Sequence, residues 1–261
     1  MNLEQTTNHL IPIAKEAGAF MREERRKFKK EDIELKGKSD LVSYVDKETE
    51  KMLVKKLSDL LPEAGFITEE QTTVQETKEY TWVIDPLDGT TNFIHGIPNY
   101  CVSIGLMYES EVVSGVVYEV AQDECFKAWK RGGAYLNEER IYVSEEVAID
   151  DCLFATGFPV HNFGKIDDYL AILNELMSNS HGLRRMGSAA SDMAYVACGR
   201  YGGYFEYNLK PWDIAAGVIL VKEAGGTVTD FKGGDDFLFG REMVSGGAVH
   251  PELLSVIKSK W

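Results

Sequence analysis

The chain has 261 residues and a formal net charge of −14, from 28 basic and 42 acidic residues. This acidic balance argues against nucleic acid or an anionic membrane surface as the main partner. No stretch approaches the roughly 20 apolar residues of a membrane span, and the N-terminus lacks the basic and apolar regions of a signal peptide, so we expect a cytoplasmic protein. The four cysteines form no CxxC or Cys/His cluster and are expected to be buried free thiols.

The first part of the chain is expected to form two helices and then strands. Apolar side chains recur at helical spacing over residues 10–21 and again over residues 45–60, where Pro62 ends the second helix. The charged run of residues 22–32 between them is typical of a solvated helix end that leads into a loop. Residues 101–129 have a strand-rich pattern.

The second part of the chain alternates between strands and helices. The pattern predicts strands at residues 153–156, 204–207, 226–230 and 243–245, and helices around residues 167–177, 188–198, 213–224 and 251–260. We therefore expect a mixed fold in one unit of residues 1–261, with an α+β half at 1–148 and an α/β half at 149–261.

The most informative segment, residues 82–93, reads WVIDPLDGTTNF. Its apolar start predicts a buried strand, and Pro86 is expected to end that strand because it fixes φ and lacks a backbone donor. Asp85 would then lie at the strand end and Asp88 in the following turn. A rigid turn that carries two carboxylates suits one or two Mg²⁺ ions.

Three small residues follow these aspartates. Gly89 allows the backbone to approach a ligand closely, and the N–H groups of Thr90 and Thr91 would face a phosphate if a helix begins there. An Asp-Gly pair alone is more often an ordinary solvated turn, but the complete string argues against that interpretation.

The string DPLDGTTNF is preceded by Glu69-Glu70 and followed by residues 210–217, KPWDIAAG. Together these segments resemble the inositol monophosphatase family of Mg²⁺-dependent, lithium-sensitive phosphatases. The resemblance extends to residues 40–46 and 187–190, and so covers nearly the whole chain. It implies a layered αβαβα sandwich and a homodimer.

The resemblance also implies two to three Mg²⁺ ions. One would be bound by Glu69, Asp85 and the backbone carbonyl of Leu87, a second by Asp85, Asp88 and Asp213, and a weaker third near Glu69. Without the resemblance, Glu69 would be assigned to a solvated loop, and Asp213 to a helix N-cap worth about 1 kcal/mol.

The catalytic residues implied by the family are Glu69, Asp46 and Thr90. The aspartate matching Asp46 hydrogen-bonds the threonine matching Thr90, and this pair orients and helps to deprotonate the attacking water. Asp46 taken alone would be read as a helix N-cap. The family also has a mobile loop near residues 36–39 that closes over the third metal.

Substrate contacts are also implied by the match. Glu206 matches a glutamate that binds sugar-ring hydroxyls, and residues 187–189 match a segment whose backbone lines the same pocket. Arg184 and Arg185 are expected to be surface residues. The complete substrate-binding set is Asp88, Gly89, Thr90, Gly187, Ser188, Ala189, Glu206 and Asp213.

These residues predict metal-assisted hydrolysis of a phosphate monoester by in-line attack of an activated water. The sequence after Gly89 favours myo-inositol 1-phosphate as the substrate. Phosphatases for 3'-phosphoadenosine 5'-phosphate, fructose 1,6-bisphosphate or NADP are alternatives. A factor that binds the transcription machinery is an alternative of another class, because some bacterial relatives have that role, and a catalytically inactive metal-binding scaffold is a third.

Overall fold

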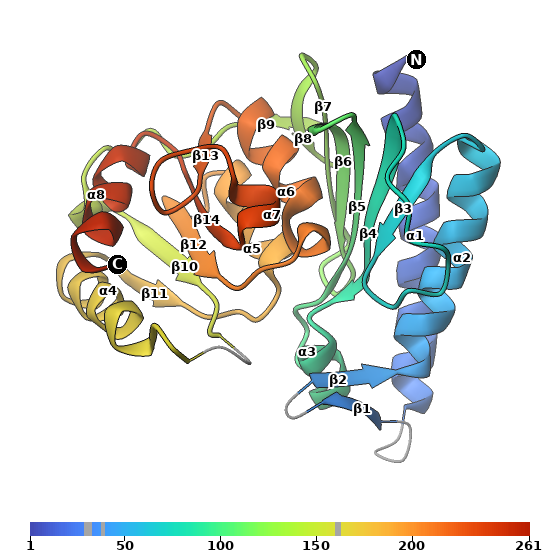
Figure 1. Ribbon diagram of the computed structural model, residues 1–261, viewed down its shortest axis with the longest axis horizontal. Helices are drawn as coiled ribbons and strands as arrows, with labels where there is room; N and C mark the ends of the chain where they lie inside the picture. Colours follow the sequence, from blue (N-terminus) through green and yellow to red (C-terminus); the bar gives the residue numbers. More distant parts are fainter. Residues whose placement is uncertain (29–32, 38–39, 160–162) are drawn as a thin grey trace.

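The computed structural model describes residues 1–28, 33–37, 40–159 and 163–261, which form five alternating layers of helices and sheets (Figure 1). One outer layer consists of α1 (Leu3–Lys27) and α2 (Tyr44–Leu60), and the other contains α4 (Ile166–Asn179) and α8 (His250–Lys260). Between the two sheets lie α5 (Ala189–Ala197) and α6 (Pro211–Glu223). This arrangement confirms the expected αβαβα sandwich.

The larger sheet has seven strands in the order β3-β4-β5-β6-β7-β8-β9. Its first pair is parallel and the other pairs are antiparallel. The central strands are buried along almost their whole length, because helices cover both faces of the sheet. The bounds are β3 (Gly65–Thr68), β4 (Tyr80–Asp88), β5 (Cys101–Tyr108), β6 (Glu111–Glu119), β7 (Glu124–Trp129), β8 (Gly133–Leu136) and β9 (Glu139–Ile141).

The smaller sheet has five strands in the order β11-β10-β12-β14-β13 and mixes parallel and antiparallel pairs. All its strands come from the second half of the chain, and those of the larger sheet come from the first half. The division at residues 148 and 149 itself remains a prediction. The bounds are β10 (Leu153–Thr156), β11 (Gly182–Arg184), β12 (Gly203–Tyr207), β13 (Thr227–Thr229) and β14 (Glu242–Gly246).

Several short elements complete the described residues. A hairpin of β1 (Ile33–Gly37) and β2 (Asp40–Ser43) replaces part of the loop predicted between the first two helices, while Lys38 and Ser39 lie outside the described residues. The helix α1 continues to Lys27, further into the charged run than its apolar pattern indicated. The remaining elements are α3 (Thr90–His95), a 3₁₀ helix (Ile149–Asp151) and α7 (Phe237–Gly240).

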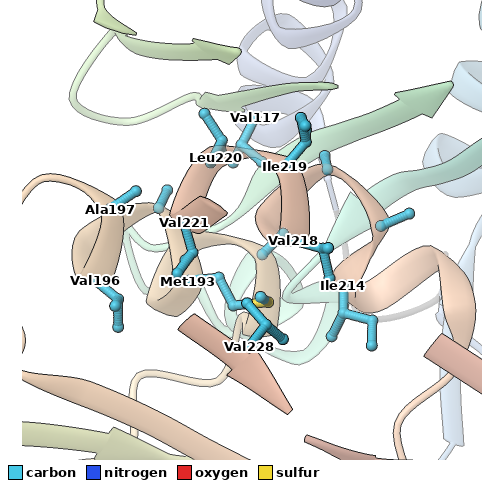
Figure 2. Close-up of a cluster of buried hydrophobic side chains, with 14 of the residues drawn as sticks. Val117, Met193, Val196, Ala197, Ile214, Val218, Ile219, Leu220, Val221 and Val228 are labelled. Atoms are coloured by element: carbon cyan, nitrogen blue, oxygen red, sulfur yellow. The ribbon is translucent and has the colours of Figure 1, made fainter. Parts of the chain in front are cut away.

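The central helix α6 is hydrophobic on all sides and packs against residues from both halves of the chain (Figure 2). Two glycines of the larger sheet permit its close approach. A Cβ atom at Gly105 would lie 2.9 Å from the Ala215 Cβ, and one at Gly115 would lie 2.6 Å from the Ile219 Cγ2. Because no side chain intervenes, the backbone of α6 is seated directly on β5 and β6.

Two further expectations concern the cysteines and the membrane. All four cysteines are free, as expected, but only Cys101, Cys125 and Cys152 are buried, and Cys198 is partly exposed. Within the described residues, none of the helices combines the length and the apolar character needed to span a bilayer.

Candidate active site

The end of strand β4 brings Asp85, Leu87 and Asp88 to the edge of the larger sheet. The prediction that Pro86 ends this strand is wrong, because β4 continues to Asp88. The register with β5 shifts between Asp85, opposite Ser103, and Asp88, opposite Cys101. This irregularity accommodates a proline that cannot donate to the ladder, and irregularities of this kind redirect the side chains that follow them.

Asp85 lies at the centre of a group of acidic side chains. It is 2% exposed, and it accepts a hydrogen bond of 3.0 Å from the Leu87 N–H. Burial raises the pKa of Asp85 well above its usual value, and the negative charges of Glu69, Asp88 and Asp213 raise it further. The side chain of Glu69, directly after β3, also hydrogen-bonds to Asp85. The structure therefore brings together the four acidic residues that the sequence assigned to the metals.

Asp88 connects β4 to the start of α5. Its Oδ2 accepts hydrogen bonds from the Ser188 hydroxyl and from the Ala190 N–H, both 2.7 Å long. Burial raises the pKa of Asp88 to about 6, although these hydrogen bonds lower it. The first half of the chain thus supplies the carboxylate and the second half supplies its donors.

Asp213 lies in the first turn of α6. The N-cap prediction is wrong by three residues, since Lys210 is the N-cap and Asp213 accepts a 2.7 Å hydrogen bond from its N–H. Burial and the charge of Asp88 raise the pKa of Asp213 to about 8. The Lys210 N–H bonds only to Oδ2 of Asp213, so the other carboxylate oxygen remains able to bind a ligand.

Asp46 has the same position in α2 as Asp213 has in α6. Ser43 is the N-cap, and both its N–H and its hydroxyl donate to Asp46 Oδ2 at 2.9 Å and 2.6 Å. The other oxygen, Oδ1, accepts a 2.9 Å hydrogen bond from the Thr90 hydroxyl, which also lies 3.0 Å from the Leu87 carbonyl. Burial raises the pKa of Asp46. The predicted Asp46–Thr90 contact is therefore present in the structure.

The turn between β4 and α3 requires a glycine. Gly89 has a φ of 94°, and a Cβ there would lie 3.0 Å from the Asn99 carbonyl oxygen. The helix α3 begins at Thr90, as the phosphate interpretation required, but it is only six residues long.

A cavity of about 150 Å³ adjoins these carboxylates. Six of the eight residues in the substrate-binding prediction line it, and Gly89 and Thr90 do not. Gly157, directly after β10, leaves space for the Glu206 side chain, because a Cβ at Gly157 would lie 1.8 Å from Glu206 Oε2. The six lining residues are Asp88, Gly187, Ser188, Ala189, Glu206 and Asp213.

Glu206 is partly exposed and accepts a hydrogen bond from the Tyr204 hydroxyl. Burial raises the pKa of Glu206 to about 7. A larger open hollow of about 690 Å³, lined in part by Ile149, Glu175 and Glu252, shares no residue with this site.

Two charged residues that line the cavity were not among the predicted site residues. Arg185 is exposed, as expected, yet it lines the cavity, and its guanidinium carbon lies 5.5 Å from the centre of the Phe158 ring. Asp192 in α5 is 2% exposed, and within the described part of the chain its Oδ1 has no hydrogen-bond partner. Its acidic side chain interrupts an otherwise apolar helix, which was the available signal.

The carboxylates and the Leu87 carbonyl are the oxygen donors that a hard cation such as Mg²⁺ prefers. Their crowding also fits a cation, because buried negative charges that repel one another require a positive partner. Among the residues that the structure describes, no three acidic, histidine or cysteine side chains already converge as a ligand set.

Comparison with known proteins agrees with this geometry. The sequence profile of the family described as "Inositol monophosphatase family" matches residues 2–260 of this chain. A Mesorhizobium japonicum protein named "Inositol-1-monophosphatase" is 39% identical over 253 residues, covering 96% of this chain and 95% of that protein. A Neisseria meningitidis serogroup B protein named "Putative Nus factor SuhB" is 40% identical over 249 residues, covering 95% and 94%.

A solved structure is similar over the same extent. The inositol monophosphatase from Anabaena (Nostoc) superimposes with a TM-score of 0.90 at 33% identity, and the match covers 100% of this chain and 98% of that one. Sequence profile, relatives and architecture agree, and the chain belongs to the inositol monophosphatase family.

Proposed function

We propose that the protein is a Mg²⁺-dependent phosphate monoester hydrolase whose preferred substrate is myo-inositol 1-phosphate. The observation that carries the proposal is the group of neighbouring carboxylates of Glu69, Asp85, Asp88 and Asp213, of which Asp85 is buried, beside a cavity lined by Asp88 and Asp213. The relative named "Inositol-1-monophosphatase" supports the choice of substrate.

In this proposal Glu69, Asp85 and the Leu87 carbonyl would hold one metal, and Asp85, Asp88 and Asp213 would hold a second. A third, weaker ion would bind near Glu69. When bound, Mg²⁺ lowers the pKa of a bound water and offsets the negative charge of the phosphate. The buried carboxylates, in turn, give up their protons to bind it, since only the ionised form is an effective ligand.

The protein's own groups position the reactants. Thr90, held by Asp46 Oδ1, orients the attacking water, and Asp46 is the acceptor at the end of this hydrogen-bonded pair. Glu69 completes the catalytic set beside the water. The leaving oxygen departs on the side of Asp213, so that attack and departure are in line.

The alcohol part of the substrate occupies the cavity. Glu206 accepts hydrogen bonds from ring hydroxyls, and residues 187–189 line the same cavity. A glutamate held between Tyr204 and Gly157 has little freedom to move away, which favours a substrate with hydroxyls in fixed positions. The protein acts in the cytoplasm as a homodimer, and size-exclusion chromatography with light scattering that shows a monomer would contradict the second point.

The test is release of phosphate from myo-inositol 1-phosphate with and without Mg²⁺ and Li⁺. Parallel reactions use 3'-phosphoadenosine 5'-phosphate, fructose 1,6-bisphosphate and NADP. Mg²⁺-dependent, Li⁺-inhibited turnover with the inositol ester preferred is the expected result. Preference for another ester would overturn the substrate and keep the mechanism, and no turnover on any ester would overturn the enzymatic proposal.

A second candidate function is a role as a Nus factor in transcription. The observation that favours it is the relative named "Putative Nus factor SuhB", which matches nearly the whole chain. Because the chain is strongly acidic, we expect such a role to depend on protein contacts and not on direct nucleic-acid binding. Affinity purification from its own cells, followed by detection of RNA polymerase subunits, tests this role independently of catalysis.

A further inference from the structure

The helix α2 carries a buried carboxylate that the proposed mechanism does not use. Glu50 has 0% exposure, and its two oxygens accept four hydrogen bonds. Oε1 accepts from the Thr68 hydroxyl at 2.9 Å, the Thr72 hydroxyl at 2.8 Å and the Thr72 N–H at 2.7 Å. Oε2 accepts from the Glu70 N–H at 2.7 Å. All four donors belong to residues 68–72.

This segment holds Glu69 and has an unusual backbone. Gln71 has a φ of 53°, a left-handed conformation that is unfavourable for a residue other than glycine. Glu70 and Thr72, the residues on either side of Gln71, both donate their N–H groups to Glu50. Such a turn persists only where surrounding contacts determine it, and the Glu50 carboxylate provides these contacts.

The same helix also holds the other end of the candidate site. Asp46 precedes Glu50 by four residues, so both side chains project from one face of α2. Asp46 accepts from Thr90 after β4, and Glu50 accepts from the turn after β3. One rigid helix thus fixes the position of two chain segments that must meet at the metal-binding carboxylates.

We infer that Glu50 is a positioning residue that holds Glu69 in place for metal binding by fixing the backbone of residues 68–72. This inference rests on the proposed function, because it assigns Glu69 to a metal. Groups that orient a metal ligand commonly contribute 10- to 100-fold to metal affinity. A purely structural Glu50 would instead affect folding and leave the affinity of the folded protein unchanged.

The test is Glu50→Gln, which keeps the size of the side chain. The glutamine amide has only one acceptor oxygen, and its NH₂ group would face N–H or hydroxyl donors that it cannot accept from. Titration calorimetry with Mg²⁺ on EDTA-stripped protein measures affinity, and thermal unfolding in EDTA measures the fold separately. We expect Mg²⁺ binding to weaken about 10- to 100-fold in protein that remains folded.

Two further variants complete the design. Glu48→Gln is the matched control on the same helix, because the Glu48 side chain is 53% exposed and bonds to Lys51 at the surface. It should bind Mg²⁺ as the wild type does. Thr72→Val removes one hydroxyl donor and keeps the N–H donor, so we expect a smaller loss in the same direction. This variant decides the question if Glu50→Gln does not fold.

The outcomes separate the inference from the proposed function. Unchanged Mg²⁺ affinity in folded Glu50→Gln, or in Thr72→Val where Glu50→Gln is unfolded, overturns the positioning role alone. An equal loss in Glu48→Gln also overturns it, because the effect would then be one of general charge. A wild type that binds no Mg²⁺ overturns both the proposed function and the inference.

Discussion

The two ends of the candidate site meet at Asp88 but differ in how their charges are arranged. At the metal end, Glu69 and Asp213 lie close to the buried Asp85, and their negative charges contribute to its raised pKa. At the cavity end, Glu206 receives a hydrogen bond from Tyr204 and lies near the positive charge of Arg185. At the metal end the carboxylates therefore repel one another, whereas at the cavity end a hydroxyl and a nearby guanidinium offset part of the cost of the Glu206 charge.

The largest effect is expected from Asp85→Asn, which removes one charge from the metal end. We expect activity to fall about a thousandfold or more, because transition-state charge stabilisation is lost. The unfolding temperature of the metal-free protein should rise, since one source of repulsion disappears. Enzyme assay and thermal unfolding in EDTA check the two directions, with the exposed Asp59→Asn as control. A metal-free protein that is less stable than the wild type would contradict the comparison.

Removing the positioning hydroxyl should slow the reaction without weakening metal binding. Thr90→Val loses the donor to Asp46, and neither residue is assigned to a metal. We expect kcat to fall about 100- to 10,000-fold, the range for a group that assists proton transfer. Steady-state kinetics with Mg²⁺ calorimetry checks this, and a parallel loss of Mg²⁺ affinity would mean that Thr90 belongs to the metal end.

The pH dependence of stability should reveal the raised pKa values of the carboxylates at both ends, Glu206 included. The folded pKa values of Asp88 and Asp213, about 6 and about 8, lie above their ordinary value, so the folded protein retains protons that the unfolded chain releases. The resulting stability is fully present below about pH 4 and is lost as the pH rises through 6 to 8.

We therefore expect the melting temperature of metal-free protein to fall by several degrees between pH 5 and pH 8. Saturating Mg²⁺ should restore it, because the metal binds the ionised carboxylates. Thermal unfolding across this range, with EDTA and with Mg²⁺, is the measurement. A melting temperature that rises with pH in EDTA would show that the carboxylates are not strained when ionised.

The smallest effect is expected at the cavity end. Glu206→Gln replaces a carboxylate that would accept hydrogen bonds from ring hydroxyls, and one such bond is worth about 0.5–1.5 kcal/mol. The kcat/KM for myo-inositol 1-phosphate should fall about 2- to 10-fold. Turnover of p-nitrophenyl phosphate, which has no ring hydroxyls, should change little. An equal loss on both substrates would place Glu206 at the metal end.

The layers were implied by the family resemblance, and most helices were predicted from the sequence because their patterns are long. The apolar stripe of α2 extends over four turns, and α6 is almost continuously apolar. Short elements were missed, since three residues in β11 and the mixed polar pattern of β1 carry little periodicity. The error at Pro86 came from treating proline as a strand end, when a change of register accommodates it.

The acidic residues of the site could be named from the sequence, but their partners could not. The bond from Ser188 to Asp88 joins residues 100 positions apart, and no local pattern records it. Asp46 and Asp213 were recognised near helix starts but misplaced as N-caps, because the N3 position of a capping box also carries an acidic residue. The roles assigned to these residues remain predictions.

The close packing of α6 on Gly105 and Gly115 determines how substitutions in the core would affect the candidate site. Asp213 is in the first turn of this helix. A methyl group added at either glycine would clash with atoms of Ala215, Ala216 or Ile219 in the same helix. An alanine at either glycine would push the helix outward, and the helix would carry its carboxylate with it. A substitution inside the hydrophobic core would then be observed as weaker magnesium binding, so a screen for lost activity would also find positions that have no polar side chain.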